Sequence, residues 1–265
     1  MDYVIGISWP RSGHHMLVRL LQLYFGSEFG YCDYYGHDET CCREVPCRKA
    51  GKINFTKNHD FALDVPQIRG QKYLIQYREF LPSAVSNYEL FVRQGGEDSQ
   101  LAFRKFVSKE FGRYQGFIKK WVTSEFGQWQ LIINYSDFLA DPEGHLAKVI
   151  SYFGAEDKMN LTTLRNVVEQ VDGEKIEQKK VQKLKNSGVH SNRDLTAFRY
   201  YDEGLFANLK ALTMTREDVK SLFLTYLGRE PDERNMVRFQ AFENAEALKQ
   251  FIQNSPEYTA RIRKT

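Results

Sequence analysis

The chain has 265 residues, of which 42% are hydrophobic and 14% aromatic, and its formal net charge is +3. This composition supplies enough core for one α/β domain and a small additional module, and it excludes disordered and fibrous classes. The small net charge argues against a nucleic-acid partner, so any basic site must be local. No window approaches the roughly 18 uninterrupted apolar residues of a membrane span, and no signal-peptide pattern opens the chain. We therefore expect a soluble, cytoplasmic protein.

Residues 3–18 predict a strand, a tight turn and the first part of a helix. Residues 4–7 suit a buried strand, and apolar residues recur at helical spacing from Leu17 to Phe25. A turn between a strand and a helix directs backbone N–H groups at an anion, and the helix dipole favours negative charge there. The side chain of Arg11 adds a cation with forked donors. We therefore predict a phosphate or sulfate site on this turn, formed by Pro10, Arg11, Ser12 and Gly13.

Three more strands follow along the chain, and each ends in polar side chains. They are predicted at residues 52–61, 73–78 and 131–137. Residues 27–52 lack a helical or strand period, so we expect a long loop of functional importance. Helices are predicted between the strands, at residues 83–92, 99–126 and 142–153. The alternation predicts an α/β fold, with a central parallel sheet, helices on both faces and ligands at the carboxyl ends of the strands.

The polar strand ends have a positive character. Beyond Arg11 they supply two further cations and an imidazole, and they contain no cluster of carboxylates. Such a group suits a ligand with several anionic groups and a transition state with negative charge on its outer oxygens. A histidine here could remove a proton from an attacking hydroxyl near neutral pH. The residues concerned are Lys57, His59, Arg78, Ser86 and Tyr135.

Several common catalytic motifs are missing. A Walker A loop needs Lys and then Ser or Thr after its second glycine, whereas Gly13 is followed by His14 and His15. There is no GxGxxG fingerprint for a dinucleotide and no GxSxG elbow for a nucleophilic serine. Metal-assisted phosphoryl transfer from a nucleoside triphosphate is therefore disfavoured.

The four cysteines all fall in the expected loop, at Cys32, Cys41, Cys42 and Cys47. Three interpretations stay open: reduced loop cysteines, one or two local disulfides, or a zinc site that also uses His37. The spacing matches no standard zinc pattern, which makes zinc the weakest of the three.

Four motifs, in a fixed order, carry a family resemblance. Residues 10–17 are similar to P-[KR]-S-G-T-T-x-L, with histidine in place of both threonines. Lys57 and His59 match a Lys-x-His after the second strand, and Arg78 precedes Ser86 by eight residues. A Tyr-x-Asp ahead of an Asp-Pro is found at Tyr135, Asp137, Asp141 and Pro142. In these motifs the chain resembles sulfotransferases that use 3′-phosphoadenosine 5′-phosphosulfate (PAPS).

The resemblance covers residues 1–210 and implies a P-loop-like sulfotransferase fold that binds PAPS at the strand ends. Arg78 and Ser86 would hold the 3′-phosphate of PAPS, and Tyr135 would lie near the adenine. The 5′-phosphosulfate would lie on the turn made of Pro10, Arg11, Ser12, Gly13, His14 and His15.

The resemblance also implies catalytic roles. Lys57 and Arg11 would stabilise charge on the transferring sulfuryl group, and His59 would be the general base on the acceptor hydroxyl. The reaction would release adenosine 3′,5′-bisphosphate (PAP) and would require no metal. A base at Asp60 or Glu79 instead of His59 is the less favoured alternative.

Two departures from the family pattern stand out. His14 and His15 replace threonine hydroxyls, although an imidazole can also donate a hydrogen bond. The late Arg-Lys-Gly clamp on the 3′-phosphate is incomplete, and only Arg199 is carried over from it. Other cations that could replace this clamp are Lys183, Lys185 and Arg193.

Residues 211–265 predict a helical C-terminal module, which weakly resembles a module of bacterial surface-carbohydrate proteins. We therefore expect a bacterial enzyme that sulfates a hydroxyl of a glycan or glycolipid. Two alternatives stay open: a P-loop kinase that uses ATP and Mg²⁺, and a catalytically inactive nucleotide-binding scaffold. The acceptor and the oligomeric state carry no readable signal in the sequence.

Overall fold

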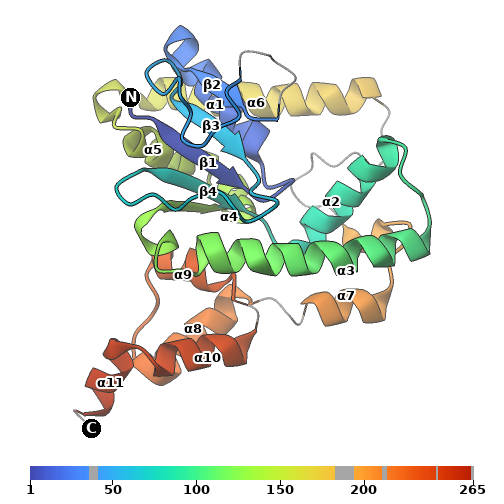
Figure 1. Cartoon of the computed structure of the whole chain (residues 1–265), viewed down its shortest axis with the longest axis vertical. Coiled ribbons are helices and arrows are strands. Elements are labelled where there is room, and N and C mark those ends of the chain that lie inside the picture. Colours follow the sequence, from blue (N-terminus) through green and yellow to red (C-terminus); the bar gives the residue numbers. More distant parts are fainter. Residues whose placement is uncertain (36–40, 183–193, 211–213, 243, 264–265) are drawn as a thin grey trace.

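The protein is described by a computed structural model that places residues 1–35, 41–182, 194–210, 214–242 and 244–263. A single sheet of parallel strands lies at its centre, in the order β2-β3-β1-β4-β5 (Figure 1). The strands are β1 (Val4–Ser8), β2 (Tyr31–Asp33), β3 (Phe55–Asn58), β4 (Tyr73–Tyr77) and β5 (Leu131–Asn134). Because all strands are parallel, their carboxyl ends share one edge of the sheet.

Helices cover both faces of the sheet, as the sequence predicted. The helices that follow the strands are α1 (His14–Phe25), α2 (Phe80–Arg93), α3 (Gln100–Phe117), α4 (Tyr135–Ala140), α5 (Pro142–Tyr152) and α6 (Leu161–Gln182). Alternate residues of β1 show the two faces: Ile5 and Ile7 are buried with α2 and α3, whereas Val4 is buried with α1, α5 and α6. The α/β fold class is therefore confirmed.

Two details of the predicted strands are wrong. The expected loop at 27–52 contains β2, which adds a fifth strand at the edge of the sheet beside β3. The strand expected at 131–137 ends at Asn134, because the Asn134 side chain accepts hydrogen bonds from the backbone N–H groups of Ser136 and Asp137 and starts α4 there. Tyr135 is consequently the first residue of a helix.

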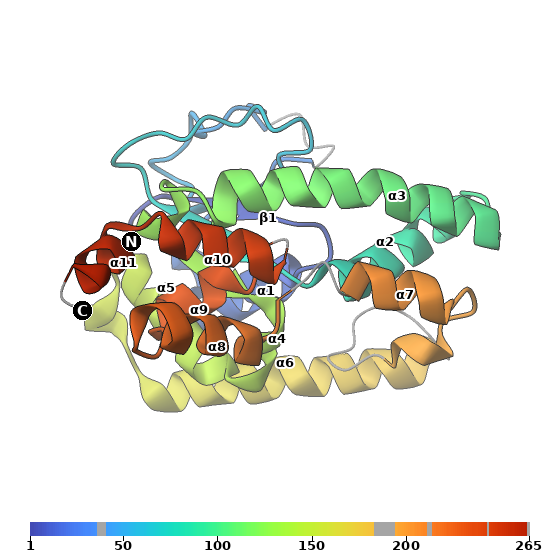
Figure 2. The same ribbon diagram turned by 90° about the horizontal axis from the view of Figure 1, so that it is seen from below.

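The C-terminal part is helical, with a buried cluster of its own around Phe223 and Leu248. Its elements are α7 (Glu203–Lys210), α8 (Arg216–Leu227), α9 (Glu233–Phe239), α10 (Ala245–Gln253) and α11 (Pro256–Ile262). Helices α8 to α11 gather together, while α7 lies apart beside α2 and α3 (Figure 2). The division of the chain at residue 210 stays a prediction. Within the placed residues, no helix combines the length and apolarity needed to cross a membrane.

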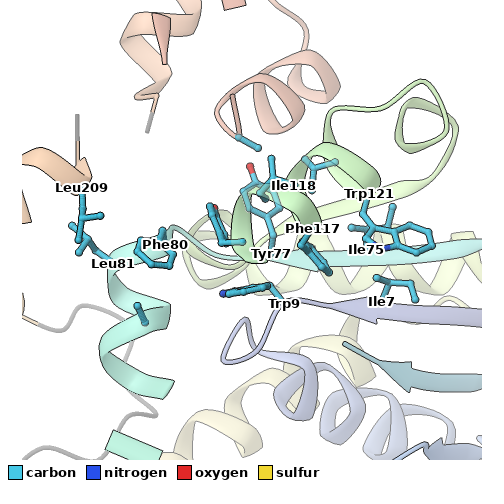
Figure 3. Close-up of a cluster of buried hydrophobic side chains, with 14 of the residues drawn as sticks. Ile7, Trp9, Ile75, Tyr77, Phe80, Leu81, Phe117, Ile118, Trp121 and Leu209 are labelled. Atoms are coloured by element: carbon cyan, nitrogen blue, oxygen red, sulfur yellow. The ribbon is translucent and has the colours of Figure 1, made fainter. Parts of the chain in front are cut away.

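A core cluster of aromatic and aliphatic side chains joins the sheet to α3 and to the C-terminal helices (Figure 3). Trp9, directly after β1, packs edge-on against Phe117 with ring centroids 5.7 Å apart. Tyr77, at the end of β4, donates a hydrogen bond from its Oη to the carbonyl of Val237 in α9, at 2.5 Å. The C-terminal helices are thus tied to the end of a central strand.

We expect Tyr77→Phe to lower the free energy of unfolding by about 1–3 kcal/mol, because the buried Val237 carbonyl loses its donor while the ring stays in place. Urea denaturation measures the change. Tyr201→Phe is the matched control at an exposed position and should change stability by less than about 0.5 kcal/mol. Equal effects of the two substitutions would contradict the importance of the Tyr77 hydrogen bond.

Candidate functional site

The turn after β1 has a backbone suited to anion binding. Arg11 and Gly13 both have positive φ angles, 65° and 85°, so the backbone is left-handed at two positions just before α1 begins at His14. The Ser12 hydroxyl donates to the Trp9 carbonyl at 2.5 Å, and the Trp9 indole donates to the Ser83 hydroxyl at 3.0 Å. A turn held in this way presents backbone N–H groups at the amino end of a 12-residue helix.

Two arginines from different elements meet beside this turn. Arg11 donates from its Nε to the Ser86 hydroxyl in α2, at 2.9 Å. Burial lowers the pKa of the Arg11 guanidinium, and the nearby cations Arg93 and Arg78 lower it further. The guanidinium of Arg78 lies 4.7 Å from the ring centroid of Tyr135. The structure therefore brings Arg11, Arg78, Ser86 and Tyr135 into one positively charged group.

Tyr135 also fixes the size of the turn. A Cβ at Gly13 would lie 2.5 Å from the Tyr135 ring, so only glycine leaves room for this contact. The positive φ of Gly13 independently favours glycine. The Tyr135 ring thus lies close to both Gly13 of the turn and the Arg78 guanidinium.

The His59 imidazole is held in one tautomer by β1. Its Nδ1 lies 2.6 Å from the Ser8 carbonyl, which can only accept, so Nδ1 carries the proton and Nε2 carries the lone pair. Burial lowers the pKa of His59 to about 4, and the charges of Lys57 and His15 add to that shift. His59 is therefore neutral near pH 7, with Nε2 able to accept a proton.

Lys57 links the end of β3 to the turn. Its ammonium lies 3.2 Å from Asp33 Oδ1 and 3.2 Å from His15 Nε2, and the residue is only 7% exposed. Because an ammonium only donates, His15 Nε2 must accept, and burial followed by the Lys57 charge lowers the pKa of His15. Lys57 thus lies beside the predicted anion turn.

His14 points in another direction from His15. Its ring is buried and stacked on Phe55, with centroids 5.2 Å apart, and its Nε2 lies 3.1 Å from the Tyr31 hydroxyl of β2. Burial holds the pKa of His14 well below its usual range, and the histidines and lysine nearby act in the same direction. The His14 side chain therefore packs against Phe55 and Tyr31, so only its backbone N–H stays available as a donor in the predicted anion turn.

Other predicted residues have clear partners elsewhere. Arg199 donates to Asp98 at 2.6 Å and lies against the rings of Phe198 and Tyr200, and these contacts do not join it to the Arg11 group. Its role on a 3′-phosphate stays a prediction. The cations considered as replacements for Arg199, namely Lys183, Lys185 and Arg193, lie outside the described residues. His37 lies outside them as well.

The two carboxylates weighed as alternative bases are both engaged. Asp60 is 2% exposed and accepts from Lys120 at 2.7 Å and from the Trp121 indole at 2.8 Å. Glu79 accepts from Asn134 and Ser136 at the end of β5. Both carboxylates therefore have partners among the described residues, and the role of His59 as the base stays a prediction.

Sequence reasoning missed the residues that support His59 and Lys57. Ser8 orients His59, Asp33 pairs with Lys57, and Tyr35 stacks on His59 with ring centroids 5.2 Å apart. The Tyr35 hydroxyl also accepts from the His59 backbone N–H at 2.8 Å. Only the three residues of β2 could have signalled this arrangement, and so short a strand inside a Cys- and Tyr-rich segment gives no usable periodicity.

A cavity of about 490 Å³ lies elsewhere, between α3 and the C-terminal helices. Its walls include Tyr114, Ile118 and Phe242, and none of the cations or histidines of the strand-end group lines it. A search for a functional site by cavity volume alone would therefore point to this cavity and not to the charged residues at the strand ends.

No protein-family model matches the chain, and no curated protein matches it by sequence. Solved structures do match. Mouse sulfotransferase SULT7A1 complexed with PAP superposes with a TM-score of 0.58 at 17% identity, over 78% of this chain and 83% of that one. Retinol dehydratase in a complex with retinol and PAP gives a TM-score of 0.50 at 16% identity, over 78% and 79% of the two chains. The predicted sulfotransferase fold is therefore confirmed.

The buried histidines make stability depend on pH. His14 and His59 have lowered pKa values when folded, so the unfolded chain binds more protons, and stability is lost as the pH falls below the unfolded value of about 6.5. When the pH falls from 7.5 to 5.5, each of these two histidines should lower the free energy of unfolding by about 1.4 kcal/mol. His14→Gln should remove about 1.4 kcal/mol of this dependence. Urea denaturation across the range checks the slope, and a constant free energy of unfolding would contradict it.

Proposed function

We propose that this chain is a sulfotransferase that moves a sulfuryl group from PAPS to a hydroxyl and releases PAP. The observation that carries the proposal is the fixed tautomer of His59, whose Nδ1 is bound to Ser8 while Lys57 lies beside the anion turn. This arrangement pairs a neutral base with a cation at the carboxyl edge of the sheet. The sulfotransferase fold of the chain supports the assignment.

The residues at the strand ends fit the donor. The residues at the carboxyl ends of the strands offer guanidinium, hydroxyl and backbone N–H donors, which suit the phosphates of PAPS. Arg11 and the turn through His15 would hold the 5′-phosphosulfate, and Arg78 with Ser86 would hold the 3′-phosphate. Tyr135 would lie near the adenine. Pro10 and Gly13 serve by shaping the turn.

The chemistry divides between two side chains. When bound, PAPS supplies a sulfuryl group whose in-line transfer places negative charge on the oxygens around sulfur and on the leaving phosphate. In this proposal Nε2 of His59, which carries the lone pair because Nδ1 is bonded to the Ser8 carbonyl, takes the proton from the acceptor hydroxyl. Lys57 has three N–H donors and directs two of them at Asp33 and His15, so a third is available, among the described residues, for the developing charge.

We further propose that the acceptor is a hydroxyl of a glycan or glycolipid, that the enzyme is bacterial and cytoplasmic, and that no metal takes part. This choice of acceptor depends on the weak resemblance of residues 211–265 to a module of surface-carbohydrate proteins. A kinase that uses ATP and Mg²⁺ and an inactive nucleotide-binding scaffold are the rival functions. No contact in the described residues favours either one.

Binding of PAP separates the donor classes. We expect calorimetry in EDTA to show PAP binding with a dissociation constant in the micromolar range or below. Ser86→Ala should weaken it about fivefold to tenfold, because Arg11 loses the hydroxyl that orients it. Ser108→Ala, on the exposed side of α3, is the control and should bind normally. Absence of PAP binding, together with tight ATP binding once Mg²⁺ is added, would establish the kinase instead.

Transfer of labelled sulfate from PAPS to a panel of phenols, sugars and glycolipids tests the catalytic roles. His59→Ala should lower kcat at least about 100-fold and leave PAP affinity within about threefold, because the base acts on the acceptor. Lys57→Ala should reduce kcat similarly, whereas Lys52→Ala at an exposed position should have no effect. Full transfer activity in His59→Ala would rule out its role as base, and PAP binding without transfer to any acceptor would favour the scaffold.

A further inference from the structure

The four thiols of the chain lie in two close pairs, one of which begins in β2 at Cys32, while the other three cysteines lie between β2 and β3. Cys32 Sγ lies 3.4 Å from Cys41 Sγ, and Cys42 Sγ lies 3.6 Å from Cys47 Sγ. All four cysteines are free in this structure. Sulfur atoms this close reach bonding distance after small side-chain rotations.

We propose that these cysteines form a reversible modification site, at which a small-molecule disulfide converts the pairs into Cys32–Cys41 and Cys42–Cys47 disulfides, and that the first bond holds Tyr35 over His59. The grouping into two pairs argues against a shared metal. Within the placed parts of the chain, no three His, Cys, Asp or Glu side chains converge as metal ligands. His37, considered earlier for zinc, lies outside those parts.

The thiols differ in a way that sets the order of reaction. Burial tends to raise the pKa of Cys42, but hydrogen bonds with the backbone at Glu44 and Arg48 and with Cys47 bring it below its ordinary value. Burial raises the pKa of Cys47 and raises that of Cys32 to about 12. The thiolate of the partly exposed Cys42 is therefore the first nucleophile in its pair.

The chemistry balances with one equivalent of oxidant for each pair. The Cys42 thiolate attacks one sulfur of the small disulfide, forms a mixed disulfide and releases one small thiolate. Cys47 then loses its proton to water and attacks Cys42 Sγ, which releases the second small thiolate. Two protein thiols are oxidised, and one small disulfide is reduced to two thiols. Cys32 and Cys41 react by the same stoichiometry.

The Cys32–Cys41 pair is directly connected to the candidate site. Cys32 is the middle residue of β2, between Tyr31, which contacts His14, and Asp33, which pairs with Lys57. Tyr35 follows in the same segment, and its ring covers the His59 imidazole in a nearly parallel stack of 14°. A bond from Cys32 to Cys41 would join residues that precede and follow Tyr35 in the sequence, so we expect it to restrict movement of that ring away from His59.

The linkages are tested on the whole protein with oxidised glutathione, alkylation of the remaining thiols and peptide mass mapping. We expect bonds 32–41 and 42–47, both reversed by dithiothreitol. Cys47→Ser should trap glutathione on Cys42, and Cys32→Ser should leave the 42–47 bond intact. Complete alkylation of all four cysteines after oxidation, or a pairing other than these two, would overturn the proposal.

The contact between Tyr35 and His59 is tested by the rate at which diethyl pyrocarbonate modifies His59, read by mass spectrometry. Oxidation should slow this reaction about tenfold or more, because Nε2 of His59, the atom that the reagent attacks, becomes less accessible. The Cys32→Ser, Cys41→Ser double variant should show no such change. The exposed His15 is an internal control. An unchanged His59 rate in fully oxidised protein would refute the restraint. A slower sulfuryl transfer in the oxidised form rests on the function proposed above, whereas the linkage map and the acylation rate do not.

Discussion

The anchoring of Trp9 is the constraint on which the rest of the site depends. Its indole donates to Ser83 in α2 and its ring packs against Tyr114 and Phe117 of α3. The turn that follows therefore cannot move independently of the helices on that face of the sheet. Since Ser86 lies one turn further along α2 from Ser83, the same helix that anchors the turn also orients Arg11. The residues that position the turn and those predicted to bind the donor thus belong to one packed unit.

A division of labour between two adjacent histidines follows from the geometry of α1. His14 and His15 are consecutive, so their side chains leave the helix about 100° apart. One enters the apolar layer between the helix and β3, and the other reaches Lys57. Two imidazoles that look equivalent in the sequence therefore serve different purposes: His14 fills space and bonds to Tyr31, while His15 accepts from the lysine.

The sequence predicted the parts of this molecule that have a regular period or a local motif. Strands such as β1 and β4 are runs of apolar residues buried on both faces. The start of α5 is likewise predictable, because the capping residue Asp141 directly precedes Pro142 in the sequence. The parallel order of the strands was enough to predict that Arg11, Lys57, His59 and Arg78 follow strand ends on one edge of the sheet. The supporting contacts could not be foreseen, because β2 has only three residues and pairs through its backbone with a strand more than 20 positions away. Likewise, no local sequence pattern predicts the hydrogen bond from Arg199 to Asp98, which lies 101 residues earlier in the chain.

The left-handed backbone at Arg11 has a consequence for how this chain could change. A residue with a side chain in this conformation is less stable than glycine by roughly 1–2 kcal/mol. The backbone conformation alone would therefore favour glycine at this position, whereas the arginine side chain adds the hydrogen bond from its Nε to Ser86. The turn thus combines a backbone conformation that disfavours arginine with a guanidinium that the proposed anion site would need, so a glycine here would relieve the backbone and remove that cation.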